Sequence, residues 1–118
     1  MEKRVRGVEL FTEGTIYKSF NMNTTGSEKK VMMSILDHME RDMNHIIING
    51  DTLDSMMKYT DMSKQQVRDA VSTLKRLHVI EPLELRAEYI VNPTFAIRGS
   101  YKKVWEFYSE MEQRLQNK

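Results

Sequence analysis

Apolar residues recur at helical spacing in four segments of the chain. The first segment begins at a Ser27 cap, with Glu28 in the first turn, where a helix N-terminus favours negative charge. Its apolar face consists of Val31, Met32, Ile35, Leu36, Met39 and Met43. The second begins at an Asp51 cap, and its apolar face consists of Leu53, Met56 and Met57. Both segments are predicted to be amphipathic helices.

A tight turn around Asp61-Met62 leads to a third predicted helix, which Ser63 caps. Its apolar face consists of Val67, Ala70, Val71, Leu74 and Leu77. The fourth predicted helix runs from Tyr101 to about Gln116. Its apolar stripe consists of Val104, Tyr108, Met111 and Leu115, with Trp105 and Phe107 beside it.

Four short segments have strand patterns. Thr15–Met22 alternates between apolar and polar residues, and the β-branched run that starts at His45 stops at Asn49-Gly50. Ile80–Leu85 and Tyr89–Asn92 predict two further strands joined by a tight connection at Arg86-Ala87.

The order of these elements is typical of a winged helix-turn-helix, in which the strand between the first two helices commonly pairs with the wing. We therefore predict an α+β fold, mainly α with a small β-sheet, in which each element has its own caps and periodicity. The predicted organisation is an N-terminal arm at 1–14, partly flexible or a loose strand, a winged helix-turn-helix at 15–99, and an additional C-terminal helix at 100–118.

Composition narrows the classes of protein. With 118 residues, 40% of them apolar and 30% charged, the chain is long enough for one core. It has no apolar run near the ~18 residues of a membrane span, and its charged N-terminus lacks the apolar region of a secretory signal. Cysteine is absent. We expect a cytoplasmic protein without disulfides or membrane contact. The net charge of +1 argues against nonspecific binding of polyanions.

The motifs of the common enzyme classes are absent, including the phosphate-binding loop, the dinucleotide glycine pattern, the nucleophile elbow and the zinc-protease helix. His38, His45 and His78 are scattered without the spacing of metal ligands. Asp51 and Asp54 fit a helix cap and its first turn. The tyrosines have no neighbouring histidine pair or acidic cluster. We expect no catalytic residue, metal or cofactor.

The outer face of the helix at 64–78 is the candidate DNA-binding surface. Lys64, Gln65 and Arg68 lie in its N-terminal half, which helix-turn-helix domains present to base edges. Ser63 lies where a helix N-terminus meets a phosphate, and Ser72 suits either phosphate or base. The predicted backbone contacts are Lys58, Lys75 and Arg76. The alternative is an ordinary solvated helix face.

Two further surfaces have alternative interpretations. Arg86 lies at the tip of the predicted wing between Glu84 and Glu88, so it either contacts a phosphate or belongs to a sheet edge protected by charge. The stripe on the last helix either packs on the domain or forms a homodimer interface. The dimerisation candidates are Val104, Trp105, Tyr108, Met111 and Leu115.

The segment after the predicted wing contains a compact motif. Asn92 can bond its own backbone and Pro93 forbids another ladder bond, so the strand must stop. Phe95 and Ile97 are then expected in the core, and Gly99 permits a positive φ. Arg98 is the motif's candidate for a phosphate contact.

A longer pattern includes this motif. It consists of Ser63, Val67, Ala70, Leu74 and Val79-Ile80, followed after the hairpin by Tyr89-Ile90-Val91-Asn92-Pro93, Phe95 and Arg98-Gly99. With these residues the chain resembles the RepL-type plasmid replication proteins of Gram-positive bacteria and related phage or plasmid initiators. The resemblance extends from about Tyr17 to Tyr108.

The resemblance implies a DNA-binding replication protein that recognises an origin on its own replicon. The predicted partners are double-stranded DNA and host replication proteins. It implies Ser63–His78 as the recognition helix, with Arg98, Lys102 and Lys103 as basic charge near the last helix. The chain is shorter and less basic than the family pattern. A small transcriptional repressor or copy-number regulator, and a protein-interaction module of a replication complex, are therefore the alternative functions.

Overall fold

The computed structural model describes residues 7–117, which form an α+β fold as predicted. The described helices are α1 (Thr15–Asn23), α2 (Gly26–His38), α3 (Gly50–Thr60), α4 (Lys64–Arg76) and α5 (Tyr101–Gln116). The described strands are β1 (Val8–Leu10), β2 (His45–Ile47), β3 (Ile80–Pro82), β4 (Glu88–Val91) and β5 (Ala96–Arg98). Residues 1–6 of the predicted arm and residue 118 lie outside the described part.

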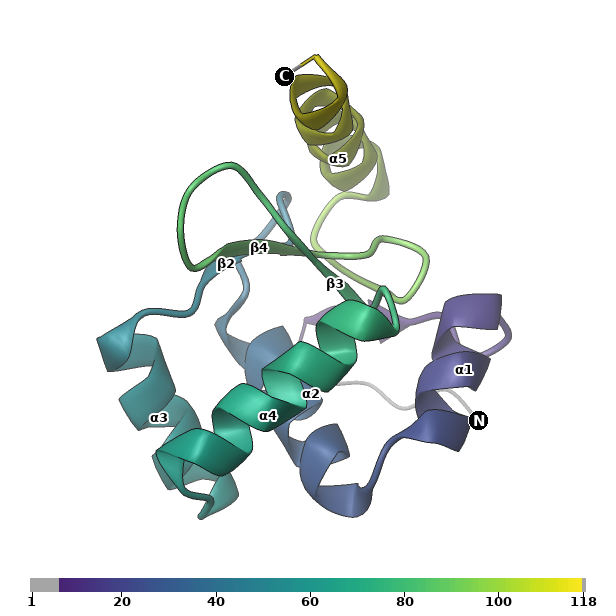
Figure 1. Ribbon diagram of the computed structural model, residues 1–118. Helices are drawn as coiled ribbons and strands as arrows, with labels where there is room; N and C mark the ends of the chain where they lie inside the picture. The colour runs from purple at the N-terminus through teal and green to yellow at the C-terminus, as the bar shows by residue number, and fades with distance from the viewer. Residues whose placement is uncertain (1–6, 118) are drawn as a thin grey trace.

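An antiparallel sheet of order β2-β4-β3 divides the molecule into two layers. Helices α2, α3 and α4 lie on one side of this sheet, and α5 lies on the other and projects from the body (Figure 1). The predicted hairpin is confirmed as β3 and β4, and the predicted pairing of the strand at His45 with the wing is confirmed by β2 and β4.

Strand alternation gives this sheet two chemically different faces. The register pairs Ile46 with Tyr89 and His45 with Ile90. Ile46 belongs to the buried core that includes α2, α3 and α4, whereas His45 contacts Phe107 of α5. One face therefore completes the helical core, and the other carries the polar side chains that meet α5.

The prediction of a strand at Thr15–Met22 is wrong, because these residues form α1. Their alternation places Met22 on the apolar face, yet Met22 is 82% exposed. The helix instead presents Tyr17 and Phe20 to Phe95, with ring centroids 5.4 and 5.0 Å from it. Aromatic packing against a distant segment decides the conformation here, and a short alternating pattern does not report it.

Two helix starts differ from the prediction by two residues. Thr25, not Ser27, caps α2, because Thr25 and Glu28 form a reciprocal capping box. Asn49, not Asp51, caps α3. The Ser63 cap of α4 is confirmed, and Gln66 completes a second capping box there. Helix α2 also ends at His38, before the predicted Met43.

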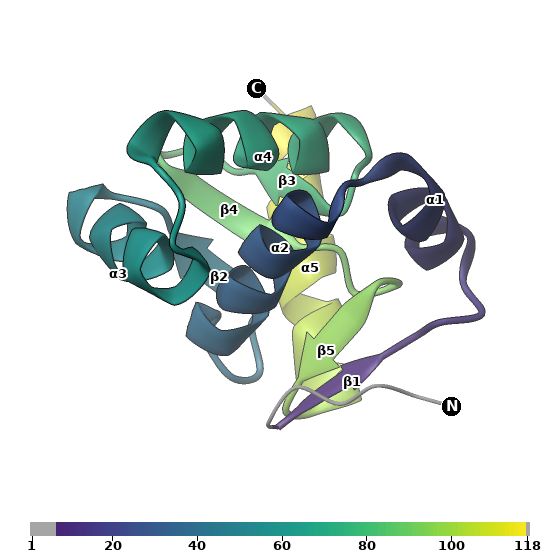
Figure 2. The ribbon, with the colours of Figure 1, turned by 90° about the horizontal axis from the view of Figure 1, so that it is seen from below.

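A second, two-stranded sheet joins β1 to β5 and lies with α1 at one end of the molecule (Figure 2). Asn44 connects it to the larger sheet. Its Nδ2 donates to the carbonyl oxygens of Val91 (3.1 Å) and Ala96 (2.7 Å), and its Oδ1 accepts from the Arg98 amide (3.1 Å). One buried amide thereby satisfies three backbone groups in β4 and β5.

The motif after the hairpin has the predicted structural role. The Oδ1 of Asn92 accepts from the backbone N–H of Thr94 at 3.0 Å, Phe95 and Ile97 are buried, and Gly99 has a φ of 92°. The sequence did not predict that Ala96–Arg98 would be a strand.

Candidate nucleic-acid interface

Four polar residues form one stripe along the exposed side of α4: Lys64, Arg68, Ser72 and Lys75. Their spacing of four, four and three residues places them on the same helix face. The adjoining face of the helix, with Val67, Ala70, Val71 and Leu74, is buried in the core. Helix α4 is therefore anchored along its length, and the stripe is held at a fixed angle to the sheet.

A groove of about 400 Å³ runs beside this stripe; we call it the α4 groove. Its lining residues are Ile48, Leu53, Arg68, Val71, Ser72, Lys75, Arg86, Ala87 and Tyr89. Three of them are cationic and none is acidic. The groove therefore places Arg68 and Lys75 of α4 beside Arg86 of the hairpin turn, above an apolar floor.

The backbone of the hairpin turn explains the position of Arg86. Ala87 has a φ of 64°, and its carbonyl oxygen accepts a hydrogen bond from the Ile48 amide at 2.8 Å. This bond fastens the turn to the segment that follows β2. Arg86 is consequently held next to α4, although the strands on either side are short.

The acidic neighbours of Arg86 lie outside the α4 groove. The Glu88 carboxylate points to the α5 side of the sheet, where its Oε2 lies 2.9 Å from Nε2 of His45. Glu84 lines a groove on that same side. The two glutamates that flank Arg86 in sequence therefore do not line the basic groove.

Three predicted contact residues lie apart from the stripe. The Gln65 Nε2 donates to Oδ1 of Asp69 at 2.8 Å, which leaves its carbonyl oxygen as the remaining acceptor. Lys58 lies on α3 beside Asp54 and Asp61, in a separate depression. Arg76 lies near Glu28 of α2, on the flank of α4.

Glu28 connects the start of α2 to α4. Burial by itself raises the pKa of the Glu28 carboxyl, but hydrogen bonds from the Thr25 backbone and from the hydroxyls of Thr73 and Thr25, together with the charge of Arg76, lower it below its ordinary value. The charged form of the Glu28 carboxyl is therefore favoured by groups on both helices, Thr25 of the α2 cap and Thr73 and Arg76 of α4.

The Ser63 side chain caps its own helix, α4. The Oγ accepts from the Gln66 amide at 3.2 Å, and Oε1 of Gln66 accepts from the Ser63 amide at 2.9 Å. This capping box defines the start of α4, and the N-terminal turn with Lys64 and Gln65 remains exposed.

Arg98 supports the fold at a distance from the α4 groove. Its Nη2 donates to the carbonyl oxygens of Leu36 (2.9 Å) and Asp37 (3.4 Å) at the end of α2, where a helix favours positive charge. The lysines that follow it are paired with carboxylates: Lys102 lies 3.9 Å from Glu106 and Lys103 lies 3.8 Å from Asp42.

The apolar stripe of α5 packs mainly on its own domain. Val104 and Tyr108 are buried, and the Trp105 ring meets the Tyr108 ring edge-on with centroids 5.6 Å apart. Met111 is half-buried and Leu115 is exposed, at the end of the helix that projects from the body. Val104 and Tyr108 are therefore closed to a partner, whereas Trp105 and Met111 are half-buried and Leu115 is open.

Sequence reasoning missed the apolar floor of the α4 groove, which Ile48, Leu53 and Tyr89 provide. The alternation of β4 could have predicted the position of Tyr89, because Tyr89 and Val91 share the sheet face opposite Glu88.

Across residues 7–117, no group of three histidine, aspartate or glutamate side chains is arranged to hold a metal ion. In the same range, no helix has the length and apolar character needed to cross a membrane. Comparisons with protein-family models, with curated proteins and with solved structures found no match.

Proposed function

We propose that residues 15–99 form a winged helix-turn-helix that binds duplex DNA, with α4 in the major groove and the β3–β4 turn against the backbone. The α4 groove is the observation that carries this proposal. It combines Arg68 and Lys75 with Arg86, and none of its lining residues is acidic. Three cations from two separate elements on one surface suit a phosphate backbone.

The stripe on α4 divides into two functional parts under this proposal. Lys64 and Arg68 lie in the N-terminal half of the helix, which reads base edges, and an arginine can bind guanine O6 and N7 bidentately. Lys75 lies two turns beyond Arg68 on α4. Together with Arg86, it contacts phosphates on either side of the DNA major groove. Gln65 contributes its free carbonyl oxygen, an acceptor for the exocyclic amino group of cytosine or adenine.

We further propose that the DNA target is a replication origin of a plasmid or phage, and that the protein acts in the cytoplasm. The resemblance of the Asn92-Pro93 and Arg98-Gly99 segment to RepL-type proteins supports this narrower role. A repressor or copy-number regulator on the same fold is the alternative. Footprinting on the replicon separates them, because an initiator protects origin repeats and a repressor protects a site that overlaps a promoter.

Fluorescence anisotropy with fragments of the protein's own replicon tests the DNA-binding proposal. We expect the double variant Arg68→Ala/Lys75→Ala to bind DNA about a hundredfold more weakly than the wild type, which corresponds to about 3 kcal/mol. Lys18→Ala is the matched control, because Lys18 is an exposed cation on α1, away from the α4 groove. Equal affinities of the double variant and the control would overturn the assignment. Failure to bind any duplex at low salt would favour a protein-interaction module.

A further inference from the structure

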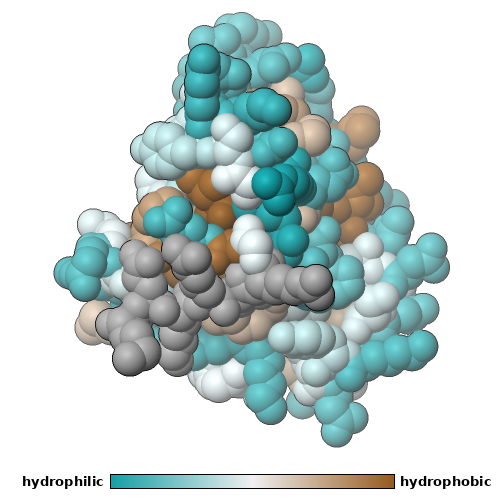
Figure 3. All heavy atoms as spheres, turned by 180° about the vertical axis from the view of Figure 1, so that it is seen from behind, coloured by the Kyte–Doolittle hydropathy of each residue, from teal (hydrophilic) through white to brown (hydrophobic). Residues whose placement is uncertain are grey.

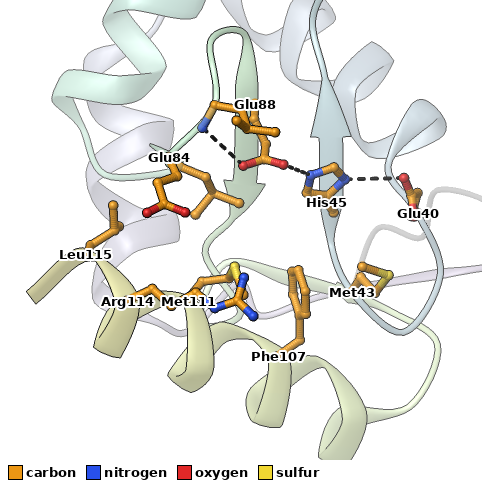
Figure 4. A pocket seen from close by; sticks show the side chains of 11 residues that line it. Glu40, Met43, His45, Glu84, Glu88, Phe107, Met111, Arg114 and Leu115 are labelled. Carbon is orange, nitrogen blue, oxygen red and sulfur yellow. Dashed lines mark hydrogen bonds and ion pairs between the residues drawn. The ribbon is translucent and has the colours of Figure 1, made fainter. Parts of the chain in front are cut away.

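A second groove lies on the face of the sheet opposite α4; we call it the α5 groove. It has a volume of about 370 Å³ and lies between the C-terminal half of α5, the β3–β4 hairpin and the start of β2 (Figure 4). Its walls are largely apolar, with Leu83 and Leu85 from the hairpin, Met43 from the segment before β2, and Phe107, Met111 and Leu115 from α5.

His45 fixes the floor of this groove. Its Nε2 lies 2.9 Å from Oε2 of Glu88 and its Nδ1 lies 3.2 Å from Oε1 of Glu40 (Figure 4). The Phe107 ring meets the imidazole edge-on, with centroids 6.2 Å apart. One side chain thus holds two carboxylates and one wall of the groove in place, so the groove is preformed.

The mouth of the α5 groove exposes apolar surface on both sides. Leu85 is 68% exposed on the hairpin and Leu115 is 38% exposed on α5. Met43 and Met111 lie deeper, and methionine side chains adapt readily to different apolar partners. Seen from behind, apolar patches interrupt the hydrophilic surface beneath the projecting end of the chain (Figure 3). Apolar residues gathered at a groove are typical of a binding surface.

The charge of the groove indicates the chemistry of its occupant. Glu40, Glu84 and Glu88 bring three carboxylates, whereas Arg114 brings one guanidinium, which lies 3.1 Å from Glu110. Carboxylates outnumber cations in the lining even when His45 is counted as charged. An occupant with a lysine or arginine beside its apolar side chains is therefore complementary to the α5 groove.

A second copy of the chain is a poor match for this groove. The open C-terminal end of its α5, from residue 110 to residue 116, carries Glu110 and Glu112 beside Arg114. Docking that helix would place carboxylates near carboxylates, which disfavours the pairing.

We propose that the α5 groove binds a short amphipathic segment of a second protein, which inserts apolar side chains between α5 and the hairpin and places a lysine or arginine against the carboxylates. The α4 and α5 grooves lie on opposite faces of the sheet, so DNA and this segment bind at the same time. The proposal does not depend on the DNA-binding function.

Selection of short random peptides displayed on phage tests this proposal. The full chain is the target, and the Leu85→Ser/Leu115→Ser variant is used for counter-selection. We expect the recovered peptides to carry apolar residues at helical spacing with a neighbouring lysine or arginine. A synthetic copy of a recovered peptide should bind the double variant at least about tenfold more weakly than the wild type. Met22→Ser is the matched control, because Met22 is 82% exposed on α1.

Two further measurements test whether the peptide binds in the α5 groove and whether it binds independently of DNA. On adding the peptide to wild-type protein, the NMR signals of the Met43 and Met111 methyl groups should shift, and that of Met22 should not. Peptide binding should also persist when duplex DNA is present. The proposal is overturned if no peptide is enriched, if the peptides lack basic residues, or if the double variant binds them equally. It is also overturned if light scattering shows a dimer that the double variant abolishes, since a second copy then fills the groove.

Discussion

The phenol of Tyr108 donates a hydrogen bond to Oε2 of Glu81 at 2.8 Å, which joins the middle of α5 to the first strand of the hairpin. Burial and the neighbouring carboxylates of Glu81 and Glu112 raise the pKa of Tyr108 well above its ordinary range, so the phenol remains a donor. Val104 is also buried, so α5 is anchored at two positions one turn apart.

Removal of this hydroxyl is expected to loosen α5. Tyr108→Phe should lower the free energy of unfolding by about 1 to 2 kcal/mol, because the acceptor is a carboxylate that loses its buried partner. Urea denaturation measures the change. The control is Tyr101→Phe, since Tyr101 is 63% exposed at the start of the same helix. If the two variants lose equal stability, the Tyr108 hydrogen bond does not hold α5.

Much of the fold follows from local sequence signals. Helix α4 was predicted from its Ser63 cap and from its apolar face, and both are present in the structure. The hairpin and α5 were predicted in the same way. These elements have consistent caps, periodicity and turn residues, so neighbouring residues alone determine their conformation.

Helix α1, which was predicted as a strand, and strand β5, which was not predicted, both depend on contacts with distant segments. Helix α1 packs Tyr17 and Phe20 on Phe95, and β5 pairs with β1 across most of the chain. Strands of three residues are too short to show a period. The position of β5 also depends on the Asn44 side chain, which donates hydrogen bonds to backbone carbonyl oxygens in both sheets. Such long-range contacts leave almost no local pattern.

The candidate site was predicted as separate residues and not as a surface. Arg68, Lys75 and Arg86 were identified one by one, but Glu84 and Glu88 obscured the charge around Arg86. Strand alternation sends Glu88 to the other face, and a register change of one residue would reverse this. The near-zero net charge therefore conceals a basic groove on one face and an acidic groove on the other.

Gly99 is expected to tolerate no side chain. Its φ is 92°, and an added Cβ would overlap Oδ1 of Asp42 and lie 2.9 Å from the Asp42 backbone nitrogen. Gly99→Ala should therefore lower the free energy of unfolding by about 2 to 4 kcal/mol. Thermal unfolding provides the measurement.

The matched control for this change is Gly50→Ala. No atom lies within 4 Å of the Cβ that would be added at Gly50, in the first turn of α3. Since alanine favours helices, stability should be unchanged or raised by up to about 1 kcal/mol. A Gly99→Ala variant as stable as Gly50→Ala would show that the chain can enter α5 by another backbone path.

Glu28 makes stability depend on pH in a defined direction. Its pKa is lowered in the folded protein, so its stabilising effect is present above the ordinary value of 4.5 and is lost as pH falls through the lower folded pKa. Glu28→Gln retains the side-chain oxygen that the capping box needs. At about pH 7 the variant should be less stable by about 0.5 kcal/mol, since the carboxylate is partly screened by water.

Urea denaturation of both proteins across acid and neutral pH tests this dependence. The stability difference should shrink below pH 4.5 and disappear once Glu28 is protonated in the folded state. Glu13→Gln is the control, because the Glu13 side chain is 94% exposed. A difference that stays constant with pH would assign the loss to altered packing and not to charge.

The salt dependence of DNA binding distinguishes the two interpretations of Arg86. A cation that neutralises a phosphate releases a counterion, so its removal lowers the slope of log K against log salt concentration by about 1. Arg86→Ala and Lys75→Ala should each reduce the slope by about this amount, and together by about twice as much. Arg114→Ala should leave the slope unchanged, because Arg114 lines the α5 groove on the opposite face. Anisotropy titrations at several salt concentrations provide these slopes. Equal slopes for Arg86→Ala and Arg114→Ala would make Arg86 a charged residue of the sheet edge, and DNA contact would then be confined to α4.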